Sequence, residues 1–142
     1  MREKSHAAMQ VAPFARVTRQ AGLAGDYRGK VQPGKAPWRQ VSFLAAEDWA
    51  CAMALLGADI PWQERRANFL TQGVILPRRA GAIIAIGPDV RIETTGECDP
   101  CRRMDAVFPG LMQALLPHWR GGVLGRVLSD GDIAVGDEIR IG

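Results

Sequence analysis

The side chains best suited to chemistry lie in one short stretch, GECDPCRRMD, at residues 96–105. Cys101 follows a proline and precedes two arginines, Arg102 and Arg103. A thiolate is both a nucleophile and a soft metal ligand, and a helix start or nearby cations favour it. Cys101 is therefore the candidate catalytic and metal-binding residue, and a buried structural cysteine is the alternative.

The same stretch predicts the start of a helix. Asp99 is a preferred N-cap residue, and Pro100 suits the first helical position because no N–H bond is lost there. This places Cys101 at the second helical position, where backbone N–H groups and the helix dipole favour an anion. Three acidic neighbours, Glu97, Asp99 and Asp105, oppose that effect.

Other readings of the cysteines have less support. Cys98 and Cys101 form a CxxC pair, but a redox CxxC normally follows the first strand of a βαβ unit, and this one lies late in the chain. Three cysteines are an odd number for a disulfide framework. Cys51 and His118 could complete four zinc ligands, but the usual second ligand pair is absent.

Composition indicates an ordinary globular protein. Of 142 residues, 47% are hydrophobic and 23% charged, which fits a single domain over residues 11–142 after a loose tail at 1–10. No apolar run is long enough for a membrane span, and the N-terminus lacks the apolar region of a secretory signal. We therefore expect a cytoplasmic protein with no membrane partner.

The net charge of +3 is modest, and acidic residues are spread among the basic ones. Nucleic-acid binding is not implied by this balance. The arginine doublets at 65–66, 78–79 and 102–103 are each expected on a solvated face more often than at an anion site. Residues 29–38, rich in Gly, Pro and Lys, are expected to form an exposed loop.

One segment has clear helical periodicity. Apolar residues at helical spacing predict a helix over residues 46–56, with its buried face formed by Ala46, Trp49, Ala50, Met53 and Leu56. Glu47 and Asp48 suit the N-terminal end of this helix, and Gly57 suits its C-terminal end. Cys51 lies opposite the buried face without a basic neighbour and is expected to be inert.

Most other segments are short and apolar or alternating, which is typical of strands. The expected strands are 39–44, 68–71, 82–86, 90–95, 121–128, 133–135 and 138–141. A hairpin is expected at Asp130-Gly131, a second tight connection at residues 86–90, and further helical pieces after Cys101 and after Pro109. Strands do not alternate with helices, so a strand-rich barrel with a few short helices is predicted.

Five segments, in order, resemble the MOSC domain, the family named for the C-terminal domain of molybdenum cofactor sulfurase. They are GLAGDYRG at 22–29, RQVSFLAAEDW at 39–49, RRANFLTQGVIL at 65–76, IGPDVRIETTGECDPCRRMD at 86–105, and WRGGVLGRVLSDGDIAVGDEIRI at 119–141. The resemblance runs from about Ala12 to the last residue. It implies a mainly β fold, a MOSC-type β-barrel with a few short helices.

The resemblance also implies a site. The family's characteristic cysteine matches Cys101, whereas Cys98 matches no family requirement. Molybdopterin carries a phosphate, and arginine forks suit phosphate oxygens. The expected contacts to a molybdenum-pterin cofactor are Arg39, Arg66 and Asn68, then Arg102 and Arg103, with Gly96 allowing a tight turn near the thiol.

Three functions remain open, of which the resemblance implies the first two and the arginines suggest the third. The first is binding of the molybdenum-pterin cofactor through Cys101 within an oxidoreductase system, which would need an electron-donor protein and a small-molecule substrate. The second is a sulfur carrier that receives a persulfide on Cys101 from a sulfur-donor protein. The third is a non-catalytic module that binds an anion or a partner. No self-contained pyridoxal phosphate site is expected, because the chain has no aminotransferase-like domain.

Overall fold

The computed structural model describes residues 14–23 and 39–142. Its strands are β1 Phe14–Thr18, β2 Gly22–Leu23, β3 Val41–Ala45, β4 Phe69–Thr71, β5 Ile83–Ile86, β6 Val90–Glu97, β7 Val123–Ser129, β8 Gly131–Ala134 and β9 Ile139–Ile141. Its helices are α1 Ala46–Leu56, η2 Trp62–Arg65, α2 Arg102–Val107, α3 Leu111–Leu115 and η3 Pro117–Trp119. The expectations for residues 1–10 and 29–38 lie outside the described residues.

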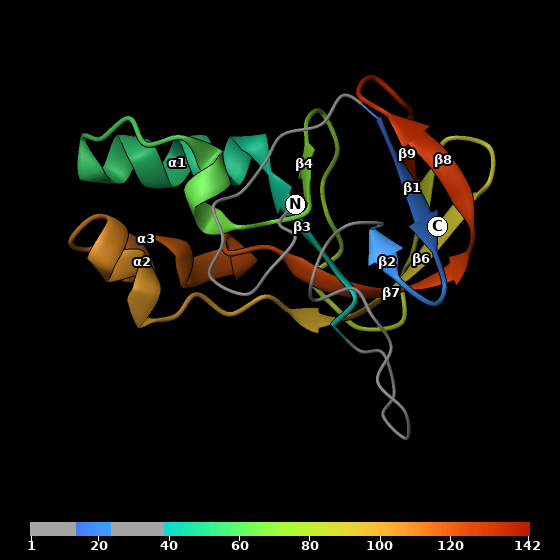
Figure 1. Cartoon of the computed structure of the whole chain (residues 1–142). Coiled ribbons are helices and arrows are strands. Elements are labelled where there is room, and N and C mark those ends of the chain that lie inside the picture. The colour runs from blue at the N-terminus through green and yellow to red at the C-terminus, as the bar shows by residue number, and fades with distance from the viewer. Residues whose placement is uncertain (1–13, 24–38) are drawn as a thin grey trace.

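The strands form two sheets. Six strands pair in the order β4-β3-β7-β6-β5-β9, and three pair in the order β2-β1-β8. All of these pairings are antiparallel except that of β3 with β4, which is parallel. Figure 1 shows the sheets curling around one another, with the helices gathered at one end. The prediction of a strand-rich, barrel-like fold with a few short helices is confirmed.

The two sheets share one apolar core, because β1 and β2 add side chains to a cluster built mainly by the larger sheet. Its fully buried members include Val17, Phe43, Ile84, Val90 and Ile92. Burying a side chain of this size stabilises the fold by about 1.5–3 kcal/mol. The core thus fixes the position of β6, and the cysteine-bearing segment follows the end of that strand.

A second apolar cluster lies under the helices. Trp49 and Met53 of α1 pack with Met104 of α2 and with Leu111 and Leu115 of α3. The predicted helix at 46–56 is confirmed, and Gly57 ends it in the left-handed region at φ 60°. Ala52 rather than Ala50 is buried on its inner face. Among the described helices, none has the length and apolar character that crossing a membrane requires.

Several local expectations are wrong. Asp130-Gly131 makes no hairpin between β7 and β8, because β8 leaves the larger sheet and pairs with β1. A Cβ on Gly131 would lie 2.9 Å from both Asp89 Cβ and Val90 Cγ2, so close packing explains the glycine. Strands β1 and β2 were not expected. The tight connection between β5 and β6 is confirmed, with Gly87 at φ 59°.

The predicted helix start at Asp99-Pro100 is wrong by two residues. Helix α2 begins at Arg102, and Cys101 is its N-cap with extended backbone at φ −119° and ψ 178°. The preceding segment stays extended because the Cys98 N–H donates to the Gly122 carbonyl at 2.9 Å. Strand β6 also continues through Gly96 to Glu97, so the tight turn expected at Gly96 is absent.

Candidate functional site

A cavity of about 130 Å³ opens beside the cysteine-bearing segment. Its walls come from the start of β3, the connection between η2 and β4, the segment after β6, and α2. The lining residues are Arg39, Gln40, Val41, Ser42, Arg65, Arg66, Asn68, Cys98, Cys101, Arg103, Met104 and Leu124. Four of them are arginines and none of the described lining residues is acidic. The cavity is therefore suited to an anion next to a thiol.

Arg65 is the buried cation of this site. Its side chain sits at the end of η2, and the residue is only 8% exposed. Nε donates to the Gly121 carbonyl at 3.1 Å, and Nη2 donates to the Cys98 carbonyl at 2.7 Å. No carboxylate of the described chain pairs with it. Since a buried charge is costly without a counter-ion, the guanidinium favours an anion in the cavity that it lines.

The two cysteines of the site have different environments. Cys98 is buried, and its Sγ accepts a hydrogen bond from Arg65 Nη2 at 3.4 Å. Cys101 is exposed. Both thiols are free, and both residues line the cavity. Cys101 can therefore meet a reagent from solution, whereas Cys98 is held in the wall.

Asn68 and Ser42 join β3 to the start of β4. Asn68 Oδ1 accepts from the Ser42 N–H at 2.8 Å, and the Asn68 N–H donates to Ser42 Oγ at 3.2 Å. Arg66, just before this junction, has left-handed backbone at φ 63°. A non-glycine residue in that region carries strain, and such strain clusters at functional sites. The junction fixes where Arg66 enters the cavity wall.

Gln40 anchors the part of the cavity wall that precedes β3. It is 2% exposed, its Nε2 donates to the Arg19 carbonyl at 2.6 Å, and its Oε1 accepts from the Val127 N–H at 2.8 Å. A buried amide that satisfies both donor and acceptor holds its backbone in one place. Arg39 precedes this anchor and is exposed at the cavity.

Two carboxyls lie beside the cysteine segment. Burial raises the pKa of Glu97, and the charge of Asp99 and a side-chain hydrogen bond with Asp99 raise it further. These two side chains alternate with Cys98 along the extended segment, and neither lines the cavity. Two of the three acidic neighbours expected to act against a thiolate thus interact with each other and lie outside the cavity lining.

The structure brings together most of the site residues expected from the sequence. Cys101, Arg39, Arg66, Asn68 and Arg103 all line one cavity. Gly96 lies within β6, and Arg102 is exposed on α2; neither lines the cavity. Groups of three or more metal-binding side chains of the His, Cys, Asp or Glu type do not occur in the described part of the chain.

Sequence reasoning missed Arg65 and Gln40. The doublet at 65–66 was expected on a solvated face, but Arg65 is buried and Arg66 half-buried. The doublets at 78–79 and 102–103 are exposed, although Arg103 also lines the cavity. No periodic signal marks Arg65, because its partners lie 33 and 56 residues away in the chain.

Comparison with known proteins gives a family and a fold. A family model described as the MOSC domain matches residues 28–140, most of the chain. None of the curated proteins compared with the chain matches it. The family match covers every described lining residue of the cavity.

Solved structures share the fold at low sequence identity. The YuaD protein from Bacillus subtilis superposes with a TM-score of 0.76 at 19% identity, covering 99% of this chain and 91% of that one. YiiM from Geobacillus stearothermophilus gives 0.68 at 18% identity, and YiiM from Escherichia coli gives 0.69 at 17%. These two matches cover 93% and 94% of this chain, which spans 62% and 64% of the respective YiiM chains.

Proposed function

The chain belongs to the MOSC domain family, and on that premise we propose that it binds a molybdenum-pterin cofactor within an oxidoreductase system. In this proposal the Cys101 thiolate is the metal ligand and the arginines of the cavity bind the cofactor's phosphate. The observation that carries the proposal is the buried guanidinium of Arg65, which has no acidic partner in the described chain and lines the same cavity as the cysteine.

The donor set supports a phosphate-bearing ligand. Guanidinium groups form paired, charge-assisted hydrogen bonds with phosphate oxygens. Arg39, Arg66 and Arg103 line the cavity with Arg65, so a phosphate placed there would lie among several guanidinium groups. Asn68 acts differently in this proposal, because its Oδ1 is bonded to Ser42 and fixes the wall.

The thiol and the cavity volume also bear on the fit. Thiolate sulfur is a suitable ligand for a soft transition metal, and Cys101 is the exposed thiol of the site. The cavity of about 130 Å³ equals roughly four water volumes, which suits a phosphate group. The pterin rings would therefore extend outside this cavity. Such a cofactor would supply electron transfer at its metal, with electrons delivered by a separate donor protein.

A sulfur carrier is the second candidate. An exposed cysteine can receive sulfur from a donor protein and present the resulting persulfide to an acceptor. Cys101 is exposed at the cavity, while Cys98 is buried beside it. This separation favours loading at Cys101 alone.

The test is to purify the protein from a molybdenum-replete host and to measure bound molybdenum, released pterin and intact mass. We expect molybdenum and pterin in near-equal amounts with the protein, and loss of both in Cys101→Ser. Cys98→Ser is the matched control, since serine replaces a buried thiol that is held by Arg65, and it should retain most of the cofactor.

The other outcomes separate the alternatives. If the purified protein contains no molybdenum but its mass shows one added sulfur atom on Cys101, the protein is a sulfur carrier and the cofactor proposal is wrong. A folded protein that carries neither molybdenum nor an added sulfur atom, but still binds inorganic pyrophosphate, would indicate a non-catalytic anion-binding module. An equal requirement for both cysteines would make the CxxC pair the functional unit.

A further inference from the structure

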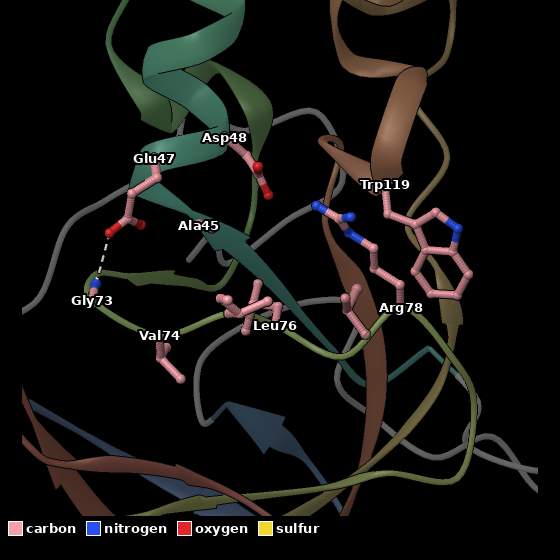
Figure 2. A pocket seen from close by; sticks show the side chains of 10 residues that line it. Ala45, Glu47, Asp48, Gly73, Val74, Leu76, Arg78 and Trp119 are labelled. Atoms are coloured by element: carbon pink, nitrogen blue, oxygen red, sulfur yellow. Dashed lines mark hydrogen bonds between the residues drawn. The ribbon is translucent and has the colours of Figure 1, made fainter.

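A second cavity, of about 190 Å³, lies at the other end of β3. It is bounded by the first turn of α1, the connection that follows β4, the last residue of η3 and the first residue of β7. Its lining residues are Ala45, Glu47, Asp48, Gly73, Val74, Ile75, Leu76, Arg78, Trp119 and Val123. Figure 2 shows these side chains around a common space. None of them lines the cavity of the cysteines.

One wall of this second cavity is tied in place. Glu47 Oε2 accepts the backbone N–H of Gly73 at 2.7 Å, the bond drawn in Figure 2. This hydrogen bond lowers the pKa of Glu47. Because the bond joins the first turn of α1 to the connection after β4, it fixes these two walls of the cavity relative to each other before any ligand binds.

Two opposite charges face this space without bonding to each other. In Figure 2 the guanidinium of Arg78 reaches toward the carboxylate of Asp48. No ion pair within 4.0 Å joins them, and neither side chain forms a hydrogen bond with another described residue. Burial raises the pKa of Asp48, although Arg78, Arg120 and His118 act in the opposite direction. The carboxylate of Asp48 is thus partly removed from water, and no described neighbour donates a hydrogen bond to it.

The remaining walls are apolar. Ala45, Leu76 and Val123 are buried, and the indole of Trp119 lies beside the stem of Arg78 in Figure 2. Trp119 has left-handed backbone at φ 56°, as does the residue before it. Two adjacent non-glycine residues in that region carry strain, which persists only where the surrounding structure imposes it.

The charges limit the class of ligand. A phosphate would meet the carboxylates of Glu47 and Asp48, and a simple cation would meet the guanidinium of Arg78. Because Glu47 is already bonded to the Gly73 N–H, a molecule with one positive and one negative group would satisfy the remaining pair, Asp48 and Arg78. The volume is slightly above the roughly 150 Å³ of an apolar cavity that accepts benzene, so the ligand must be small. Its apolar part would contact the side chains of Leu76, Val123 and Trp119.

We propose that this cavity binds a free α-amino acid with an aliphatic side chain. Asp48 accepts hydrogen bonds from the ammonium group, and Arg78 donates to the carboxylate. The aliphatic side chain packs on the apolar walls, with Ile75 at the rim, where it is 84% exposed. This site does not depend on the cofactor or on Cys101.

The test is calorimetric titration of the full chain with L-leucine. We expect saturable binding, and at least tenfold weaker binding of leucinamide, which lacks the carboxylate, and of 4-methylpentanoate, which lacks the ammonium group. Asp48→Asn and Arg78→Gln should each weaken L-leucine binding at least tenfold. Arg79→Gln is the matched control, because Arg79 is exposed and outside the cavity, and it should bind as the unchanged protein does.

Two results would overturn this assignment. One is no saturable response up to ~50 mM L-leucine, which exceeds the millimolar Kd expected for a ligand of this size. The other is equal binding of L-leucine by Asp48→Asn and by the unchanged protein, with both folded by circular dichroism. Loss of molybdenum in Cys101→Ser has no bearing on either result, so the two proposals fail separately.

Discussion

The guanidinium of Arg65 holds Cys98 at two points, with Nη2 donating to the carbonyl oxygen at 2.7 Å and to Sγ at 3.4 Å. The same side chain reaches the Gly121 carbonyl through Nε. One buried cation therefore ties η2, the end of β6 and the approach to β7 together. The segment that presents Cys101 is positioned by a residue that does not adjoin it in sequence.

Arg65→Met should weaken both the fold and anion binding. The change removes three hydrogen bonds from a charged donor but also removes a buried charge, so we expect a net loss of about 2 kcal/mol in the free energy of unfolding. Inorganic pyrophosphate should raise the Tm of the unchanged protein and leave that of the variant unaltered. Arg79→Met, at an exposed position, is the control. A variant still stabilised by pyrophosphate would show that Arg65 is not needed for the anion.

Gly121→Ala should destabilise the same junction. An added Cβ would lie 2.7 Å from the Cys98 carbonyl oxygen, 3.1 Å from Arg65 Nη2 and 3.1 Å from Pro100 Cδ. Overpacking of this kind costs about 1–3 kcal/mol, measurable by urea unfolding. Gly96→Ala is the matched comparison, because a Cβ there would meet nothing within 4 Å, and we expect a change within about 0.5 kcal/mol. Equal effects of the two changes would contradict the packing argument.

The elements predicted from the sequence are those whose signals lie within the element. Helix α1 has its apolar spacing, its acidic first turn and its terminal Gly57 in one continuous segment. The corner at Gly131 depends instead on Asp89 and Val90, which pack against it from another strand. The local hairpin signal therefore predicted the turn correctly, but it predicted β7 as the partner of β8, which pairs with β1 instead.

The residues of the candidate site also differ in whether local sequence or long-range contacts determine their positions. Cys101, Arg66 and Asn68 could be identified from family-like motifs, and the fold brings them to one cavity. Burial of Arg65 arises from contacts with Cys98 and Gly121 in other elements. The helix start was misplaced because the Cys98 N–H still bonds to the Gly122 carbonyl and Cys101 keeps extended backbone, so the helix begins only at Arg102. Such long-range pairings carry no local pattern.

Glu97→Gln should stabilise the protein at neutral pH but not in acid. Burial and Asp99 raise the pKa of Glu97 above its ordinary value of 4.5. The native state therefore keeps a proton that the unfolded state releases. The stability linked to that proton is complete below pH 4.5 and is lost as pH rises through the raised pKa. Glutamine stays neutral and can still donate to Asp99, so its advantage should appear only above this range.

Urea unfolding at a series of pH values between about 4 and 7.5 measures this difference. Asp99→Asn should change stability in the same direction, because it removes the like charge beside Glu97. A difference between Glu97→Gln and the unchanged protein that stays constant across the series would show that the carboxyl pair does not control the pH dependence.

Alkylation should distinguish the three thiols by burial and by local charge. Cys98 is 6% exposed and should react last, whereas Cys51 and Cys101 are exposed. Cys101 shares its cavity with four arginines, while Cys51 lies one helical turn from Glu47 and Asp48. Anionic iodoacetate should therefore favour Cys101 over Cys51 more strongly than neutral iodoacetamide does, and added salt should reduce the difference. Peptide mapping after brief labelling gives the two ratios. If they are the same at low salt, the arginines do not create an attractive field at Cys101.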